Sequence, residues 1–299
     1  MSEGGRVPLS GIVLIVVSAC AFGSMAILAR GVYAAGGNVP GLLLAGFAIA
    51  GAILAAIMVA TRRRWPRGRP LAVAVGMGAV GYAGQAACFF AALHYASAGL
   101  VALLLYIYPT LVVILSAIFL GERLTAGRIA LLAVGFGGLA LMLGGGSGTA
   151  TGVALGLGAA AIYSVYILVG ARELARTDAL ASTTVICLAA AATFAIAWPV
   201  TAPRFPGAAW GWAALAGLAV VGSVVAILAF FEGLKRVGPA TASIVSTFEP
   251  VFTAALAWLL LGESLTPAQM GGGALVLAAA ALSLLRRQTA AAREARPLG

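Results

Sequence analysis

The feature that most constrains this chain is a series of apolar runs, each about 20 residues long and separated by short connections. A helix of that length crosses the roughly 30 Å hydrocarbon core of a bilayer. Hydrophobic residues make up 63% of the 299 residues and charged residues only 9%, whereas a soluble domain carries about 25% charged residues. The sequence therefore predicts an all-α integral membrane protein and excludes a soluble globular fold.

We expect ten spans, with no soluble domain between them. Their predicted ranges are 11–30, 38–60, 70–93, 98–120, 127–145, 152–172, 179–200, 208–232, 239–261 and 267–286. With both termini in the cytoplasm, sixteen Lys and Arg residues fall on the cytoplasmic side and two, Arg30 and Arg204, on the other. Because cytoplasmic loops of membrane proteins are rich in Lys and Arg, this distribution predicts a multi-pass protein of the bacterial cytoplasmic (inner) membrane with that orientation. The net charge of +10 is then a topology signal rather than a nucleic-acid site.

The chain matches itself at an offset of 141 residues, so that Gly11 lies over Gly152 and Phe22 over Tyr163. Each half contains five predicted spans, and an odd number makes the halves cross the membrane in opposite senses. Such inverted repeats are typical of secondary transporters. We expect two repeats, residues 1–146 and 147–299, in one membrane domain. The first span has a counterpart in the sixth, so we interpret it as part of the fold rather than as a cleaved signal peptide.

Both repeats contain the motif G-E-x-L-T, at residues 121–125 and 262–266. The glycine suits the left-handed residue that ends a helix, and the threonine suits the N-cap of the next helix. The glutamate would lie near that helix start, where negative charge is favoured. We interpret the motif as a capped helical hairpin rather than as a substrate site.

The ten spans and the paired P-x(11)-G-E-x-L-T elements, Pro109–Thr125 and Pro250–Thr266, resemble the EamA-type, ten-helix members of the drug/metabolite transporter superfamily. The resemblance covers essentially the whole chain. It implies export of small metabolites, and the overall likeness is to amino-acid exporters of the YddG type, which include exporters of aromatic amino acids. A Trp-Gly pair is common in the first span of this family. Here Phe22-Gly23 stands in its place, so no role of that tryptophan is carried over.

Two prolines occupy matching positions near the centres of spans 4 and 9. Pro109 and Pro250 each lack an N–H and clash with the preceding turn, which should free the carbonyls of Leu105 and Ser246. A carbonyl freed in hydrocarbon must be satisfied by protein or by water in a cavity. Broken helices near the midplane build the sites of many transporters, but a simple packing kink also fits these two prolines.

Glu249 is the eleventh residue of the predicted span 239–261 and so lies near the bilayer centre. An acidic residue at that depth costs about 2.5–3.5 kcal/mol, and such residues mark functional sites by default. No Lys or Arg lies at a similar depth in any predicted span. We expect Glu249 either to pair with the ammonium group of a substrate or to carry protons. A carboxyl that hydrogen-bonds between helices for structural reasons is the alternative.

Polar side chains on spans 3, 4, 8 and 9 complete the predicted site. Tyr108 is the repeat counterpart of Glu249, and Tyr82 is the counterpart of Ser223. We expect a central cavity lined by Glu249 together with Tyr82, Gln85, Tyr106, Tyr108, Ser223, Ser243, Ser246 and Thr247. His94, the single histidine, lies at the outer end of span 3 and is a second candidate proton carrier because histidine titrates near neutral pH.

These residues favour a secondary transporter that works by alternating access on a solute with an ammonium group and an apolar or aromatic side chain. Another solute class, such as a nucleotide sugar, a quaternary amine or a drug, and a facilitative uniporter stay open. A channel would need a continuous polar stripe, and an intramembrane enzyme would need more than one midplane acid. No phosphate-binding loop is present and the three cysteines lack metal-ligand spacing, so we expect no cofactor and no metal. The expected partners are a small-molecule substrate and the lipid bilayer, without nucleic acid, and one chain suffices as a monomer.

Overall fold

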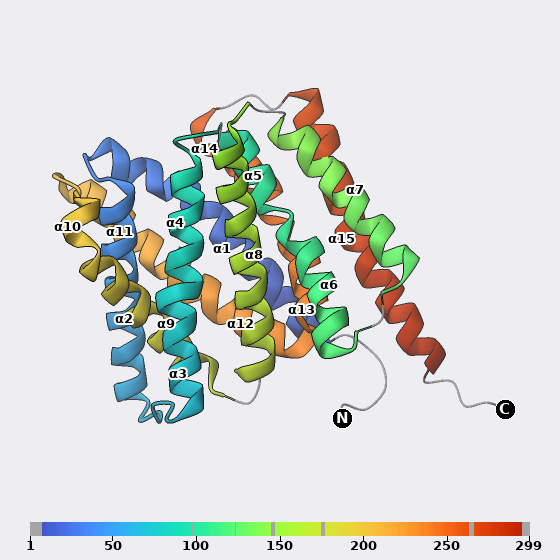
Figure 1. Ribbon diagram of the computed structural model, residues 1–299, viewed down its shortest axis with the longest axis horizontal. Helices are drawn as coiled ribbons and strands as arrows, with labels where there is room; N and C mark the ends of the chain where they lie inside the picture. Colours follow the sequence, from blue (N-terminus) through green and yellow to red (C-terminus); the bar gives the residue numbers. More distant parts are fainter. Residues whose placement is uncertain are drawn as a thin grey trace.

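The computed structural model describes residues 8–96, 98–122, 124–144, 147–174, 177–262 and 266–294. In these ranges the chain forms a bundle of helices (Figure 1). Nine helical segments of the described chain are long and apolar enough to cross a membrane, and the last helix adds a shorter apolar stretch, Pro267–Leu282. The predicted all-α membrane fold is confirmed, and each of the ten predicted spans corresponds to one of these segments.

The helices of the two repeats follow one another in the same order. The first repeat contains α1 (Leu9–Ala34), α2 (Val39–Ala60), α3 (Arg69–Gly76), the π-helix η1 (Met77–Tyr82), α4 (Ala83–Ala92), α5 (Ala98–Leu105), α6 (Tyr108–Leu120) and α7 (Ala126–Leu143). The second contains α8 (Ala150–Glu173), α9 (Ala179–Ile196), α10 (Trp198–Thr201), α11 (Ala209–Leu218), the π-helix η2 (Ala219–Val225), α12 (Ala226–Val237), α13 (Pro239–Ser246), α14 (Glu249–Leu261) and α15 (Pro267–Glu294).

The predicted boundaries need correction in span 7. We expected one helix to residue 200, but α9 ends at Ile196 and a separate single turn, α10, follows. Pro199 explains the change, because it has no N–H to donate to the carbonyl four residues back and its ring clashes with that turn, whereas proline is tolerated in the first turn of the new helix. Other predicted ends differ by no more than this, except that span 8 extends to Val237 rather than to residue 232, and α15 extends to Glu294 rather than to residue 286.

Successive spans run in opposite directions, so their connections gather at two ends of the bundle (Figure 1). We call the lower end in Figure 1 the basic face, because it carries the α2–α3 connection, residues 61–68, with four arginines, and the α12 end with Lys235 and Arg236. We call the other end the opposite face. It carries the end of α4 and the α1–α2 connection. Which face lies in the cytoplasm stays a prediction from the charge distribution.

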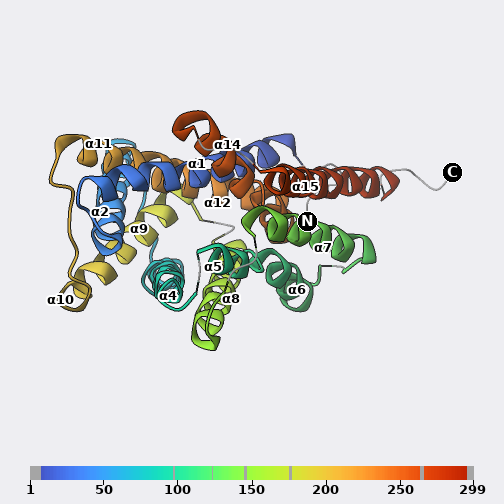
Figure 2. The ribbon, with the colours of Figure 1, turned by 90° about the horizontal axis from the view of Figure 1, so that it is seen from above.

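The internal repeat is visible as paired contacts. Gly81 packs against the ring of Tyr166, and Gly222, 141 residues after Gly81, packs against Met25, the counterpart of Tyr166. In the first contact the glycine belongs to the first repeat and the larger side chain to the second. In the second contact this is reversed, as a two-fold relation requires. Accordingly, α1 packs along α11, η2, α12, α13 and α14, whereas α8 packs along η1, α4, α5 and α6. Figure 2 shows α1 beside the second repeat's helices and α8 beside those of the first.

The π-helices η1 and η2 were not predicted. They lie at matching positions in spans 3 and 8, and each contains a predicted site residue, Tyr82 in η1 and Ser223 in η2. A π-turn inserts one extra residue into a helix and is frequent at functional sites. The residues on both sides of each π-helix have ordinary α-helical backbone angles, so spans 3 and 8 stay continuous.

The hairpin interpretation of G-E-x-L-T agrees with the local geometry. Gly121 and Gly262 end α6 and α14 with φ of 69° and 67°, where other residues are strained. Thr125 caps α7 by accepting the N–H of Arg128 at 3.3 Å. The Arg128 guanidinium also pairs with Glu122 at 3.0 Å, so this glutamate lies at the start of α7.

In the second repeat, Thr266 and Gln269 form a reciprocal cap. The Gln269 side chain accepts the N–H of Thr266 at 2.9 Å, and the Thr266 hydroxyl accepts the N–H of Gln269 at 3.2 Å. Such a capping box satisfies two N–H groups at the helix start. Pro267 is the first residue of α15, as expected. Glu263 lies outside the described residues.

The helices α7 and α15 approach each other backbone to backbone. A Cβ on Gly138 would lie 2.6 Å from the Gly272 carbonyl oxygen, and a Cβ on Gly272 would meet the Gly138 carbonyl in the same way. Small residues that permit such contact drive helix association in membranes, where the hydrophobic effect between helices is missing.

We expect Gly138→Ala to destabilise the fold because the added methyl must push α15 away. Overpacking of this kind costs about 1–3 kcal/mol, which should lower the midpoint of thermal unfolding in detergent. Gly137→Ala is the matched control, because Gly137 is exposed and nothing lies within 4 Å of its added Cβ. Equal midpoints for the two variants would show that this contact is not needed.

Candidate functional site

Spans 4 and 9 are interrupted at the same position in both repeats. α5 ends at Leu105 and α6 begins at Tyr108, whereas α13 ends at Ser246 and α14 begins at Glu249. Pro109 and Pro250 are the second residues of the helices that follow, where the missing N–H of proline leaves no bond unmade. Each proline therefore lies just inside the helix that starts after the interruption.

The backbone tightens at each interruption. The N–H of Ile107 bonds to the Leu104 carbonyl at 3.2 Å, and the N–H of Phe248 bonds to the Val245 carbonyl at 3.1 Å. These bonds span three residues instead of four, so the chain passes through one 3₁₀-like turn before the next helix.

Both new helices direct their N-terminal ends into the middle of the bundle. The first residue of α6 is Tyr108 and that of α14 is Glu249. The positive end of a helix dipole favours a carboxylate by about 0.3–1 kcal/mol. This gain is smaller than the cost of about 2.5–3.5 kcal/mol for an acidic residue at the bilayer centre, so the dipole alone does not explain Glu249.

Four phenol groups lie near Glu249. The side chains of Tyr82, Tyr106, Tyr108 and Tyr163 all lie within electrostatic range of its carboxyl group. Three of these tyrosines were predicted, and the structure brings them together from η1, the α5–α6 interruption and α6. Tyr163, from α8, was not predicted.

The rings continue as a chain of aromatic contacts, which we call the aromatic cluster. Its members are Tyr106, Tyr108, Tyr163, Tyr166, Tyr82 and Phe47. The centroid distances are 4.7 Å for Tyr108–Tyr163, 5.8 Å for Tyr82–Tyr166 and 4.9 Å for Phe47–Tyr82. Aromatic pairs attract each other at separations of this size. The cluster is therefore a packed wall beside Glu249.

Sequence reasoning placed the site on spans 3, 4, 8 and 9 and missed the contributions of α8 and α2. Tyr163 and Tyr166 come from α8, and Phe47 comes from α2. One signal was present, since Tyr163 is the repeat counterpart of Phe22 in the first span and Tyr166 lies one helical turn further on the same side. Phe47 had no such signal, because it sits in a uniformly apolar run.

The side chains around Glu249 differ in exposure. Glu249, Tyr82, Tyr106 and Tyr163 are half-buried, so part of each side chain is accessible. Tyr166 is only 4% exposed, and its hydroxyl has no hydrogen-bond partner among the described residues. A buried hydroxyl without a partner costs about 1–3 kcal/mol, which suits a region that water or a solute completes.

Residues at equivalent positions of the two repeats contact the backbone carbonyls of Tyr108 and Glu249. The Ser164 hydroxyl donates to the Tyr108 carbonyl at 3.3 Å. Gly23, the repeat counterpart of Ser164, packs against the Glu249 carbonyl, which would lie 2.9 Å from an added Cβ. The Thr253 hydroxyl donates to the Gly23 carbonyl at 3.0 Å. α8 and α1 thus fix the starts of α6 and α14 in the same manner.

Of the predicted hydroxyl groups on and next to α13, some bond within their own segment and one lies near a tyrosine. Ser246 lies within hydrogen-bonding reach of the Tyr108 hydroxyl. The hydroxyls of Ser243 and Thr247 donate within their own segment, to the carbonyls of Ala240 at 3.2 Å and Ile244 at 2.6 Å. Ser246 is therefore the hydroxyl of this group that points to the tyrosines.

Three further predicted residues lie elsewhere in the bundle. Ser223 is buried in η2, and Gln85 is half-buried in α4. His94 is exposed beyond the end of α4. It follows Tyr82 by twelve residues, which corresponds to about 18 Å along a helix. The structure therefore does not bring His94 together with Glu249.

The charged groups of the described residues form ion pairs away from Glu249. The ion pairs between described residues join helix ends, as in Arg63–Asp178 and Arg69–Glu173, and Glu249 is in none of them. Within the described ranges, no group of three or more His, Cys, Asp or Glu side chains could hold a metal ion.

Comparison with known proteins gives matches over the whole described bundle. The profile of the EamA-like transporter family matches residues 9–144 and again 150–285. The chain is similar to a probable terminal-alkyne amino-acid exporter of Streptantibioticus cattleyicolor, with 29% identity over 85% of this chain and 86% of that one. It is also similar to the aromatic amino acid exporter YddG of Ancylobacter novellus, with 32% identity over 56% of this chain and 60% of that one. One solved crystal structure superposes with a TM-score of 0.82 and 26% identity, covering 94% of this chain and 98% of the other.

We expect Glu249→Gln to raise the midpoint of thermal unfolding in detergent. Replacing an acid that no cation compensates removes part of its cost in the membrane, so a gain of about 1 kcal/mol in the free energy of unfolding is expected. Glu173→Gln is the control, because Glu173 pairs at a helix end with Arg69 and Arg172, whose side chains are exposed, and its loss should change stability by less than about 1 kcal/mol. A marked loss of stability in Glu249→Gln would instead assign the carboxyl a structural role.

Proposed function

Because the chain belongs to the EamA-like transporter family, we propose that it exports amino acids, including aromatic ones, by alternating access around Glu249. The protein is a multi-pass membrane protein and a transporter of small metabolites, and the family and the similar proteins are transporters rather than enzymes. The solute class and the mechanism are the parts that we propose.

One observation carries the proposal, namely a half-buried carboxyl at the start of α14 that lies within electrostatic range of four phenols and forms no ion pair among the described residues. A solute with an ammonium group supplies the missing positive charge. Tyrosine rings also attract a cation over their faces. The Glu249 position therefore suits the amino end of an amino acid.

The aromatic cluster supports an apolar or aromatic side chain on the solute. Half-buried Tyr163 and Tyr106 offer ring surface beside Glu249, and aromatic pairs add about 0.5–1.5 kcal/mol beyond the burial of their area. The carboxylate of the solute would face the Tyr108 hydroxyl and the positive end of α6. This end carries a neutral residue, whereas the equivalent end of α14 carries Glu249.

The charge distribution supports a setting in the bacterial cytoplasmic membrane with both termini in the cytoplasm. Export is the direction of the similar exporters and is proposed here on that basis. One chain holds both repeats and the whole group around Glu249, so a monomer is sufficient for transport.

A second role for Glu249 is open on the same geometry. A carboxyl among phenols could release and accept a proton during each cycle, whereas His94 is a weaker candidate carrier because of its distance along α4. A uniporter would need no such carrier, and a different amphiphilic cation would fit the same carboxyl. The solute and the coupling must therefore be tested separately.

We expect Glu249→Gln to abolish both proton-driven transport and counterflow of labelled amino acids in proteoliposomes if the carboxyl binds the ammonium group. Losing one partner of a buried charge pair costs about 2–5 kcal/mol, or roughly 30-fold or more in affinity. Retained counterflow with lost proton-driven transport would assign the proton role. Unchanged transport in both assays would falsify both roles.

The same assay should include nucleotide sugars and quaternary amines beside the amino acids. Glu173→Gln is the matched control, because Glu173 pairs with Arg69 and Arg172 rather than with a solute. Saturable flux that prefers aromatic amino acids supports the proposed solute class, and a preference for another class replaces it.

We expect Pro250→Ala to slow transport several-fold while the protein keeps or gains stability. In an uninterrupted span 9, residue 250 would lie in the helix interior, where alanine is favoured over proline by about 3 kcal/mol. The substitution should therefore allow span 9 to straighten. Initial rates in proteoliposomes and the unfolding midpoint measure the two effects. Unchanged rates would make the interruption a packing feature only.

A further inference from the structure

The two faces of the bundle are closed to different degrees, although the repeats that form them are equivalent. At the basic face, α13 packs against α6, and α12 packs against α8 and α9. All residues of α13 are buried. In its counterpart α5, four of the six side chains from Leu100 to Leu105 are half-buried.

A pair of phenylalanines shows the same difference. Phe230 and Phe231 of α12 are 3% and 1% exposed, and Phe231 packs against Gly170 of α8. Their counterparts in α4, Phe89 and Phe90, are half-buried. The end of α12 therefore leans into the bundle, and the end of α4 does so less.

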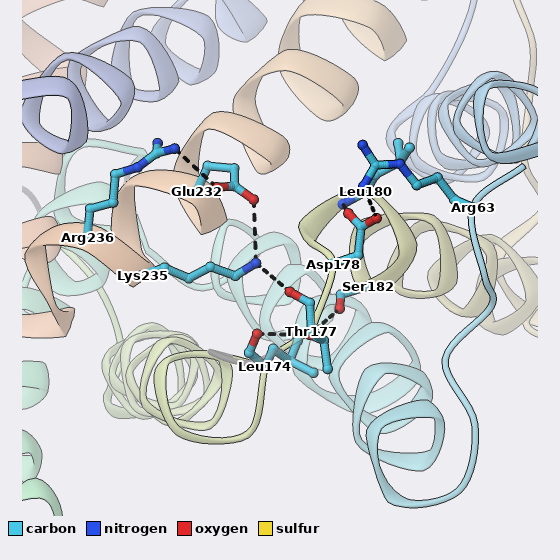
Figure 3. A network of polar contacts seen from close by, with 9 residues as sticks. All are labelled: Arg63, Leu174, Thr177, Asp178, Leu180, Ser182, Glu232, Lys235 and Arg236. Carbon is cyan, nitrogen blue, oxygen red and sulfur yellow. Dashed lines mark hydrogen bonds and ion pairs between the residues drawn. The ribbon is translucent and has the colours of Figure 1, made fainter. Parts of the chain in front are cut away.

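Lys235 joins the end of α12 to the α8–α9 connection. Its ammonium group donates to the Thr177 carbonyl at 2.6 Å and lies 3.4 Å from the Glu232 carboxylate (Figure 3). The Lys235 side chain is 19% exposed. Thr177 is itself fixed, since its hydroxyl donates to the Leu174 carbonyl at 2.8 Å and lies 2.8 Å from the Ser182 hydroxyl.

The neighbouring part of this connection is built alike at both faces. Asp178 caps α9 and pairs with Arg63 at 2.7 Å (Figure 3). At the opposite face, Asn38 caps α2 and accepts the N–H of Arg204 at 2.8 Å. Arg204 follows Arg63 by 141 residues. Both faces thus have a helix cap that contacts an arginine, and the basic face has the Lys235–Thr177 bond in addition.

The counterpart of Lys235 is His94, again at an offset of 141 residues. Its Nδ1 lies 3.2 Å from the carbonyl oxygen of Phe90 on its own helix, and the side chain is exposed. The turn Gly36–Gly37 precedes the cap Asn38 as Thr177 precedes Asp178. A contact that mirrored Lys235–Thr177 would join His94 to this turn, and the described residues do not form it.

We propose that Lys235 is a latch that holds the basic face closed, and that His94 is its counterpart in the opposite state. When the Lys235–Thr177 bond breaks, α12 swings away from the α8–α9 connection. The equivalent movement brings the end of α4 to the Gly36–Gly37 turn, where His94 donates to a backbone carbonyl. This proposal rests on the alternating access proposed above. With the basic face in the cytoplasm, the structure is an outward-facing state.

Thiol labelling measures the two states directly. The background lacks Cys20, Cys88 and Cys187, and single cysteines report from Ser243→Cys at the closed end and from its counterpart Ala102→Cys. Ser243 is fully buried and Ala102 is half-buried. A membrane-impermeant maleimide is added from either side of sealed vesicles. We expect faster labelling of Ala102→Cys, from the side of the opposite face.

Lys235→Met removes the donor and keeps the length of the side chain. We expect labelling of Ser243→Cys from the basic face to rise about tenfold or more, as the loss of one charge-assisted hydrogen bond implies, and labelling of Ala102→Cys to fall. Arg236→Met is the matched control, because Arg236 also pairs with Glu232, at 3.5 Å, and extends from the same helix end. Lys235→Arg keeps a donor and should keep the closed state.

His94→Ala tests the second half of the proposal in the Lys235→Met background. Removing the counterpart should lower the raised labelling of Ser243→Cys again, because the alternate state loses its own closing contact. Equal labelling in Lys235→Met and Arg236→Met overturns the latch. An unchanged or higher rate on adding His94→Ala overturns the role of His94. Labelling reports the conformation without any solute, so a failed role for Glu249 leaves this result intact, and a failed latch leaves Glu249 untouched.

Discussion

Backbone hydrogen bonding inside hydrocarbon governs how this chain can be built. Every N–H and C=O group in that layer must find a partner within the protein or in enclosed water, so an interrupted helix is tolerated only where neighbours surround it. The two interruptions, before Tyr108 and before Glu249, lie where α8 and α1 supply those neighbours through Ser164 and Gly23. The same requirement places both new helix starts in the middle of the bundle, and it thereby creates a polar region that an unbroken bundle would lack.

The two repeats have equivalent backbones and packing, but the side chains at some equivalent positions differ in chemical character. Tyr108 and Glu249 occupy equivalent positions, but only one of them is a carboxylic acid. Lys235 and His94 are also equivalent, but only Lys235 bonds to the connection beside it. In the proposed mechanism, the two halves exchange roles between states because their packing is alike, and they recognise the solute in one orientation because their side chains differ.

The sequence predicted the parts of this structure that depend on local or repeated signals. Apolar run lengths located the spans, and glycine and threonine located the ends at Gly121 and Thr125. The π-helices escaped prediction because a helix that is apolar on all sides has no periodic pattern in which one extra residue would show. Tyr166 and Phe47 escaped because their place beside Tyr82 depends on packing between distant segments. The closure of one face was also beyond prediction, since nearly equivalent repeats favour neither face.

The exchange of packing partners between the repeats has a consequence for biosynthesis. α1 lies against α11, α12, α13 and α14, all of which belong to the second half of the chain. During translation the first five spans are synthesised before these helices exist. The surface of α1 that later packs against them is therefore not yet covered by its partners. The small residues on that surface, Gly11 and Gly23 among them, present little that is costly to lipid in the meantime. The first half of the chain thus reaches its final packing only when the second half arrives.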